Sequence, residues 1–238
     1  MNAFERIELV RKKKGHCILS LIDPDLKNDP YLTEIIKKSN NKLFDGILVG
    51  GSSIEDDKFE SRVNTIKNNS DLPIMLFPGS VRQLTPLIDS VLYLNLISGR
   101  NPKYLIEEHV EGAFKVKEYN ICPVPTAYIL LDGGNQTSVQ TISQTKPLNM
   151  NDKDLVLSHA LAGEHLGNKI IYFDCGSGSE KIIDSDLLKY ITENIKTPVM
   201  VGGGINSKQD IELLVNSGAS YIVVGNILEG NTDFTLFE

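Results

Sequence analysis

Several residue types are scarce in this chain. Its 238 residues include no Trp, 3 Cys and 4 His. Cys17, Cys122 and Cys175 are widely separated and form no C-x-x-C pair, which argues against a disulfide framework or a structural zinc site and for a reducing cytosol. The His residues lack metal-ligand spacing, and no nucleophile–base motif of a hydrolase is present. The common cysteine- and histidine-based chemistries are therefore not expected.

Long apolar runs and an excess of positive charge are also lacking. No apolar run approaches the roughly 18 residues that span a bilayer, and the charged N-terminus does not resemble a signal peptide. The net charge of −7 argues against a general surface for nucleic acid or anionic membranes. We therefore expect a cytoplasmic protein without a transmembrane segment, which meets lipid only by peripheral contact.

Short apolar runs alternate with helical patterns along the whole chain. Strands rich in Ile, Val and Leu are predicted at residues 16–22, 44–49, 73–77, 90–95, 124–131, 169–174, 197–201 and 220–224. Helices are predicted at 3–14, 31–39, 56–68, 102–119 and 151–166, with two more between the last three strands and a closing segment at 227–237. Residues 81–90 contain Pro86 and make a poor helix, whereas the polar stretch 132–147 is predicted to be a loop.

This alternation favours the α/β class and a single (βα)8 TIM barrel over residues 1–238, with a degenerate third helix. An open, doubly wound sheet is the competing architecture. A dinucleotide-binding sheet would carry G-x-G-x-x-G after its first strand, whereas here the glycines cluster late and Gly202 to Gly204 lack the third fingerprint glycine. Barrels of this size often associate, so we expect a homo-oligomer.

Glycine-rich turns follow the last three predicted strands. These turns are Cys175-Gly-Ser-Gly-Ser179, Gly203-Gly204 and Gly225-Asn226. Free backbone N–H groups attract phosphate, and the ends of strands seven and eight form the standard phosphate site of barrels. Plain turns are the weaker alternative. Within the sixth strand end, Asp174 could deprotonate a hydroxyl of a bound phosphoester or only cap a helix, and Tyr172 could contact phosphate or belong to the core.

Polar residues also follow the earlier strands. Asp23 and Asp25 offer oxygen ligands that suit Mg²⁺, and Ser52 in the next loop would lie near Asp23 in a barrel. The alternatives are an Asp-Pro turn and a serine helix cap, about as well supported. Arg100 could bind diphosphate in bidentate fashion, although a solvated surface role is the more common one for arginine.

Taken together, six motifs resemble those of geranylgeranylglyceryl phosphate synthases, in the same order. They are Leu21-Ile-Asp-Pro-Asp25, Asp45-Gly-Ile-Leu-Val-Gly-Gly-Ser-Ser53, Ser98-Gly-Arg-Asn-Pro102, Tyr172-Phe-Asp-Cys-Gly-Ser-Gly178, Val201-Gly-Gly-Gly-Ile205 and Val223-Val-Gly-Asn226. The resemblance covers nearly the whole chain, and the Pro125-Thr-Ala-Tyr stretch looks like the archaeal and Bacteroidetes-type branch.

The resemblance implies a prenyltransferase of lipid biosynthesis. In this reaction the C3 hydroxyl of sn-glycerol 1-phosphate attacks a polyprenyl diphosphate, geranylgeranyl being the expected chain, and diphosphate leaves. It implies Mg²⁺ at Asp23 and Ser52 and a base at Asp174. The glycerol phosphate would be held by Tyr172, Phe173, Asp174, Cys175, Gly176, Ser177, Gly178, Gly203, Gly204, Gly225 and Asn226.

Two positions depart from the family pattern. Asp174 stands where the family usually has a longer Glu, and Leu21 stands where some members carry Lys. A sugar-phosphate isomerase, an aldolase and a non-catalytic phosphate-binding barrel are the alternative functions. An aldolase would need a Lys at a strand end, whereas Lys169 stands at a strand start. An apolar groove beside the phosphate site would favour the prenyltransferase over the isomerase.

Overall fold

The computed structural model describes residues 1–52, 54 and 56–229 and forms a closed barrel of eight parallel strands in sequence order. Its strands are β1 Cys17–Ile22, β2 Gly46–Val49, β3 Ile74–Leu76, β4 Ser90–Leu96, β5 Cys122–Leu130, β6 Ile170–Asp174, β7 Val199–Gly202 and β8 Tyr221–Val224. Pairing of Cys17 with Tyr221 and of Ser20 with Val224 closes the ring between β1 and β8. The predicted TIM barrel is therefore confirmed, and the open sheet is excluded.

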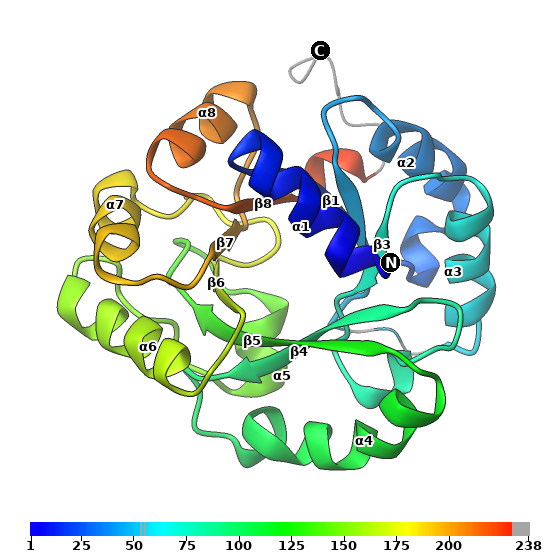
Figure 1. Ribbon diagram of the computed structural model, residues 1–238, viewed down its shortest axis with the longest axis horizontal. Helices are drawn as coiled ribbons and strands as arrows, with labels where there is room; N and C mark the ends of the chain where they lie inside the picture. Colours follow the sequence, from blue (N-terminus) through cyan, green and yellow to red (C-terminus); the bar gives the residue numbers. More distant parts are fainter. Residues whose placement is uncertain (53, 55, 230–238) are drawn as a thin grey trace.

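The helices surround the strands (Figure 1). They are α1 Ala3–Lys14, α2 Leu32–Ser39, α3 Phe59–Asn68, α4 Glu108–Glu118, α5 Ser138–Ser143, α6 Lys153–His165, α7 Ser185–Asn194 and α8 Lys208–Asn216. Short helical turns are η1 Leu26–Tyr31, η2 Val81–Gln83, η3 Lys103–Glu107 and η4 Asn226–Leu228. Between β3 and β4, where a barrel has its third helix, the chain forms only the turn η2, as Pro86 predicted.

Two helix predictions were inaccurate for local reasons. The predicted helix 102–119 begins as the π-helical turn η3 and becomes α-helical at Glu108. The stretch 132–147 is not only a loop, because Thr137 caps the short helix α5 by accepting a hydrogen bond from the Gln140 backbone. The closing segment 227–237 and the single domain proposed for residues 1–238 both extend into 230–238, which lie outside the described residues, as does Ser53.

Helix α1 covers the amino-terminal end of the barrel (Figure 1). Its first turn is fixed by a capping box between Asn2 and Glu5. The Ala3 backbone donates to Asp89, just before β4, and the Tyr221 hydroxyl of β8 donates to Glu8. This end of the barrel is thereby closed, so the carboxyl ends of the strands remain as the open end.

The strands are buried on both faces, and the side chains alternate between two cores. On β6, Ile170 and Tyr172 point into the barrel, whereas Ile171 and Phe173 pack against the helices. Because the period is two, Asp174 shares the inward face of Tyr172, and Cys175 belongs to the outer core. This alternation decides which residues of a strand end can reach a ligand.

The outer core should supply much of the stability. Leu188 of α7 is fully buried in it, and Leu188→Ala is expected to lower the free energy of unfolding by about 2–5 kcal/mol through lost burial and a residual cavity. Leu166, which is 71% exposed after α6, is the matched control, and its change to Ala should cost no more than about 0.5 kcal/mol. Denaturant unfolding of both variants measures the difference, and equal losses would contradict the assignment.

Candidate functional site

The open end of the barrel contains a cavity of about 460 Å³. Its lining comes from the loops after strands at opposite sides of the ring, including Asp23, Ser52, Asp174, Gly203 and Asn226. One part is bounded by glycine loops and polar side chains. The other part is bounded by apolar side chains from the loop after β3 and from η2, β4, η3 and α5. The cavity therefore joins a polar compartment to an apolar one.

Asp23 follows β1 and is held closely against the loop after β2. A Cβ atom at Gly51 would overlap with its carboxylate, so only glycine permits this contact. Its Oδ1 is buried and has no hydrogen-bond partner among the described residues. Burial and the nearby charge of Asp25 raise the pKa of Asp23 to about 7, although Lys27 opposes the shift. An unsatisfied carboxylate oxygen of this kind is suited to bind a cation.

Lys27 lies among three carboxylates at this edge of the cavity. Its Nζ is 3.9 Å from Asp23 Oδ2, 3.7 Å from Asp25 Oδ2 and 3.5 Å from Glu229 Oε2. The described residues contain no group of three or more His, Cys, Asp and Glu side chains arranged to hold a metal ion. A cation bound at Asp23 would consequently need further oxygen ligands from Ser52 or from a bound substrate.

The loop that carries Ser52 is fastened to its neighbour by Gln83. The Gln83 side chain is buried, accepts from the backbone N–H groups of Gly51 and Gly79 at 3.3 and 3.2 Å, and donates to the Gly51 carbonyl at 2.6 Å. Gly50 has a φ of 149°, and a Cβ there would overlap with the Phe77 carbonyl. The glycine pair before Ser52 is therefore needed for close backbone packing as well as for a turn.

Asp174 ends β6 and is 7% exposed. Its Oδ2 accepts a hydrogen bond from the Tyr128 hydroxyl, and its Oδ1 accepts from the Gly176 backbone at 2.7 Å. Burial raises the pKa of Asp174, whereas the two hydrogen bonds oppose that shift. Both oxygens are thus oriented. The upward shift moves the pKa of Asp174 toward the range of a general base that acts near neutral pH.

Aromatic rings form the base of the cavity below Asp174. The rings of Tyr128 and Tyr172 meet edge to face with centroids 5.2 Å apart, and the Phe77 ring lies 5.6 Å from that of Tyr172. A Cβ at Gly202 would lie 2.5 Å from the Tyr172 hydroxyl, so this hydroxyl sits against the end of β7. Burial raises the pKa of both tyrosines well above the usual value, which keeps them neutral hydrogen-bond donors.

The glycine loops after β6, β7 and β8 come together as predicted. Gly203 and Gly204 adopt φ values of 84° and 74°, and a Cβ at Gly203 would lie 2.7 Å from the Gly176 backbone N. The Ser177 hydroxyl donates to Asn226 Oδ1 at 3.1 Å and joins the first loop to the third. The Ser179 hydroxyl lines the same space and has no partner among the described residues. This cluster offers hydroxyls and exposed backbone to an anion.

Some predicted residues are placed elsewhere. The side chains of Phe173 and Cys175 are fully buried in the outer core and do not line the cavity. Arg100 is exposed and is also not in the lining, and its Nη1 donates to the carbonyls of Ile97 and Gly99 at 3.2 and 2.6 Å. Asp25 accepts a hydrogen bond from the Asn28 backbone at the start of η1.

Sequence reasoning missed three residues of the site. Tyr128 was noted only as part of a motif, although its place near the end of an apolar strand could have suggested an inward position. Ser179 lies in the predicted glycine-rich turn but was not assigned to the site. Gln83 had no signal in the sequence, because its partner Gly51 lies in a loop more distant along the chain and only the fold brings the two together.

The apolar part of the cavity opens where the third barrel helix is reduced to η2. Its lining includes Val81, Leu84, Leu94, Tyr104 and Ile142. Gly112 of α4 lies against η2, where a Cβ would be 3.2 Å from Val81 and 3.1 Å from Leu84. A full helix between β3 and β4 would occupy this space, so the short turn is what leaves room for an elongated apolar ligand. Within the described residues, no helix is long and apolar enough to cross a membrane.

Comparison with known proteins gives consistent matches over almost the full length. Residues 8–237 match the sequence model of the PcrB family. A geranylgeranylglyceryl phosphate synthase of Flavobacterium johnsoniae is 39% identical over 95% of this chain and 93% of its own, and one of Pyrococcus horikoshii is 34% identical over 93% and 86%. The crystal structure of the (S)-3-O-geranylgeranylglyceryl phosphate synthase of Thermoplasma acidophilum, in complex with substrate sn-glycerol-1-phosphate, has a TM-score of 0.89 and 28% identity, covering 96% of this chain and 92% of that one.

The hydrogen bond from Tyr128 can be tested through the acidity of Asp174. Tyr128→Phe removes a donor that stabilises the carboxylate, so the pKa of Asp174 should rise further above its usual value. Carbon NMR of the Asp carboxyl groups during a pH titration measures this pKa. Tyr93→Phe, which removes a hydroxyl bonded to the His109 carbonyl, is the control and should leave it unchanged. An unchanged pKa in Tyr128→Phe would contradict the assigned hydrogen bond.

Proposed function

Because the chain belongs to the PcrB family, we propose that it is a prenyltransferase that joins sn-glycerol 1-phosphate to a polyprenyl diphosphate, in the manner of its geranylgeranylglyceryl phosphate synthase relatives. The observation that carries the proposal is the two-part cavity, with a glycine-rich polar end and an apolar end. A sugar-phosphate isomerase would have no use for the apolar end. The family membership and this shape point to the same pair of substrates.

The acceptor is proposed to bind at the polar end. The glycine loops carrying Gly178, Gly203, Gly204 and Gly225 would direct backbone N–H groups to its phosphate, whereas the Gly176 N–H is already donated to Asp174. Ser177, Asn226 and the unpartnered hydroxyl of Ser179 would add side-chain contacts. Phe173 and Cys175 would support the loop from the outer core, because the Cys175 N–H is donated to the Gly202 carbonyl and Phe173 is paired on both sides in the sheet, whereas Tyr172 would contact the ligand from the barrel interior. A small, strongly anionic ligand fits such a cluster without any excess of basic residues.

The donor is proposed to bind across the other half, with its chain in the apolar part lined by η2, β4, η3 and α5. Its diphosphate would lie near Asp23 and Ser52, which fit Mg²⁺ because the Asp23 Oδ1 is buried without a partner and faces the Gly51 backbone. Bound there, Mg²⁺ would neutralise the diphosphate leaving group. For Arg100 to bind the diphosphate, its guanidinium would have to break its hydrogen bonds to the carbonyls of Ile97 and Gly99 and form new ones to the diphosphate oxygens.

The chemistry of the residues is then straightforward. Asp174 accepts the proton of the C3 hydroxyl, the hydroxyl oxygen forms a bond to C1 of the prenyl chain, and the bond from C1 to diphosphate breaks with its electron pair on diphosphate. Tyr128 and the Gly176 backbone hold the carboxylate in place. The shorter reach of Asp compared with Glu is thus accompanied by two fixed hydrogen bonds, which set where the base can act.

We further propose that the protein acts as one cytoplasmic domain that associates with itself. Helix α4 and the turn before it expose Ile106, Val110 and Phe114 by more than half, and their spacing of four residues places them on one face. Such an apolar stripe is unusual on an isolated molecule in water and suits a contact with a second copy or a lipid surface. Sedimentation of the protein and of Phe114→Ser tests self-association, and a monomer in both would contradict it.

The proposed reaction is tested directly by incubating purified protein with Mg²⁺, labelled sn-glycerol 1-phosphate and prenyl diphosphates of several chain lengths. We expect a lipid-soluble labelled product with at least one chain length. Omission of Mg²⁺ is the control and should abolish product formation, because the diphosphate leaving group is then not neutralised. Absence of product with every chain length would refute the proposed function.

The assigned base is tested by Asp174→Asn. This change keeps the size of the side chain but removes the proton acceptor, so turnover should fall by about 100-fold or more while binding of glycerol 1-phosphate stays within a few fold. Product formation measures the first quantity and calorimetry the second. Asp184→Asn, at the cap of α7 outside the cavity lining, serves as the matched control and should retain activity. Full turnover in Asp174→Asn would exclude this carboxylate as the base.

A further inference from the structure

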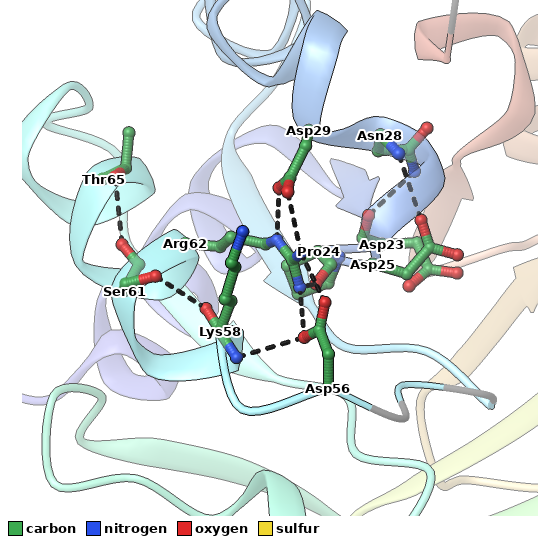
Figure 2. A network of polar contacts seen from close by, with 10 residues as sticks. All are labelled: Asp23, Pro24, Asp25, Asn28, Asp29, Asp56, Lys58, Ser61, Arg62 and Thr65. Atoms are coloured by element: carbon green, nitrogen blue, oxygen red, sulfur yellow. Dashed lines mark hydrogen bonds and ion pairs between the residues drawn. The ribbon is translucent and has the colours of Figure 1, made fainter.

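Arg62 of α3 has a nearly buried guanidinium, with a side chain that is 4% exposed. Figure 2 shows it between two carboxylates, those of Asp29 and Asp56. Its Nε and Nη2 donate to the two oxygens of Asp29, and its Nη1 and Nη2 donate to the two oxygens of Asp56, both at 2.6 Å. A buried arginine normally needs such paired acceptors, and two bidentate pairs use its planar geometry fully.

The two carboxylates belong to different loops of the proposed metal and diphosphate site. Asp29 lies in η1, the turn that follows Asp23, whereas Asp56 lies in the segment that leads from Ser52 to α3. Nη1 of Arg62 also donates to the Pro24 carbonyl at 3.1 Å, directly beside Asp23. One guanidinium therefore ties together the loops after β1 and β2.

The ties continue to Asp23 itself. Asn28, next to Asp29, is buried and donates through Nδ2 to the Asp23 carbonyl at 2.8 Å (Figure 2). On the other side, the Asp23 carboxylate packs against Gly51, the residue before Ser52. A shift of either loop would consequently change the separation between the Asp23 and Ser52 oxygens.

The negative charges of the two loops explain why the Arg62 guanidinium is needed between Asp29 and Asp56. Asp23, Asp25, Asp29 and Asp56 all lie on these two loops, and Arg62 holds the pKa of the Asp29 and Asp56 carboxyls below their usual range. Without Arg62, two ionised carboxylates would face each other with their shared partner removed. The loops would separate, although the barrel strands that carry them would still pair.

We propose that Arg62 is a positioning residue that sets the spacing of Asp23 and Ser52 for magnesium diphosphate, without touching the substrate. This inference rests on the proposed function. Mg²⁺ tolerates little departure from octahedral geometry, so a small shift of one ligand loop weakens its binding strongly. The glycine loops that would hold glycerol phosphate lie after β6, β7 and β8, where Ser177 bonds to Asn226. Lys27 links the Asp23 loop to that side of the barrel through Glu229, whereas the bonds of Arg62 go to Asp29, Asp56 and the Pro24 carbonyl.

The test compares Arg62→Lys and Arg62→Met with the wild type. Lysine keeps the positive charge but cannot form two bidentate pairs, and methionine removes the charge as well. Calorimetry measures binding of Mg²⁺ with inorganic diphosphate, and separately of glycerol 1-phosphate. We expect about 10-fold weaker binding of magnesium diphosphate for Arg62→Lys, a larger loss for Arg62→Met, and glycerol 1-phosphate affinity within twofold of the wild type.

Arg11→Lys is the matched control, because Arg11 forms a bidentate pair with Glu8 on α1 at the closed end of the barrel. It should change neither affinity. Unchanged magnesium diphosphate binding in folded Arg62→Lys would overturn the inference. Equal weakening of magnesium diphosphate binding and glycerol 1-phosphate binding would also overturn it. If the Arg62 variants do not fold, Asp56→Asn, which leaves Asp29 and the Pro24 carbonyl bound, applies the same criteria. A wild type that does not bind magnesium diphosphate would overturn the proposed function as well.

Discussion

The pairing of β8 with β1 is the constraint on which the rest of the structure depends. It closes the ring of parallel strands and brings Gly225 beside Leu21, two residues before Asp23. Helix α1 closes the amino-terminal end, and the loops after the first and the last strands line one cavity at the other end. Residues from the first and last quarters of the chain thereby share a site that neither could form alone.

Within this frame, two kinds of close packing divide the site. The late loops approach one another through glycines with positive φ, which exposes backbone to an anion. The early loops approach through Gly50 and Gly51 and are fastened by Gln83 and Arg62. The first arrangement suits a phosphate held by dipoles, and the second suits a cation held by oxygens. Asp174 lies between them with both oxygens bonded, where a proton can be taken up.

Prediction succeeded where a short pattern had one physical reading. Apolar runs that end in glycine indicated buried parallel strands, and Pro86 indicated that the third helix would be reduced. It was less successful where the direction of a side chain depends on its place in the alternation of a strand, or where its partners are distant along the chain. Phe173 and Cys175 lie in the same motif as Tyr172 and Asp174 but face the helices, because successive residues of a strand point to opposite sides. Helix α5 was missed because its cap, Thr137, lies in a stretch without apolar periodicity.

The sequence by itself determined the class of fold, the order of its elements, the glycine loops and the family, because each depends on residues that are near one another in the chain. Only the tertiary structure decided which residues face the cavity and what holds them. Gln83 joins Gly51 to Gly79, Tyr128 bonds to Asp174, and Arg62 joins Asp29 to Asp56. These contacts arise when strands pair and loops meet in space, and the spacing of residues along the chain contains no record of them.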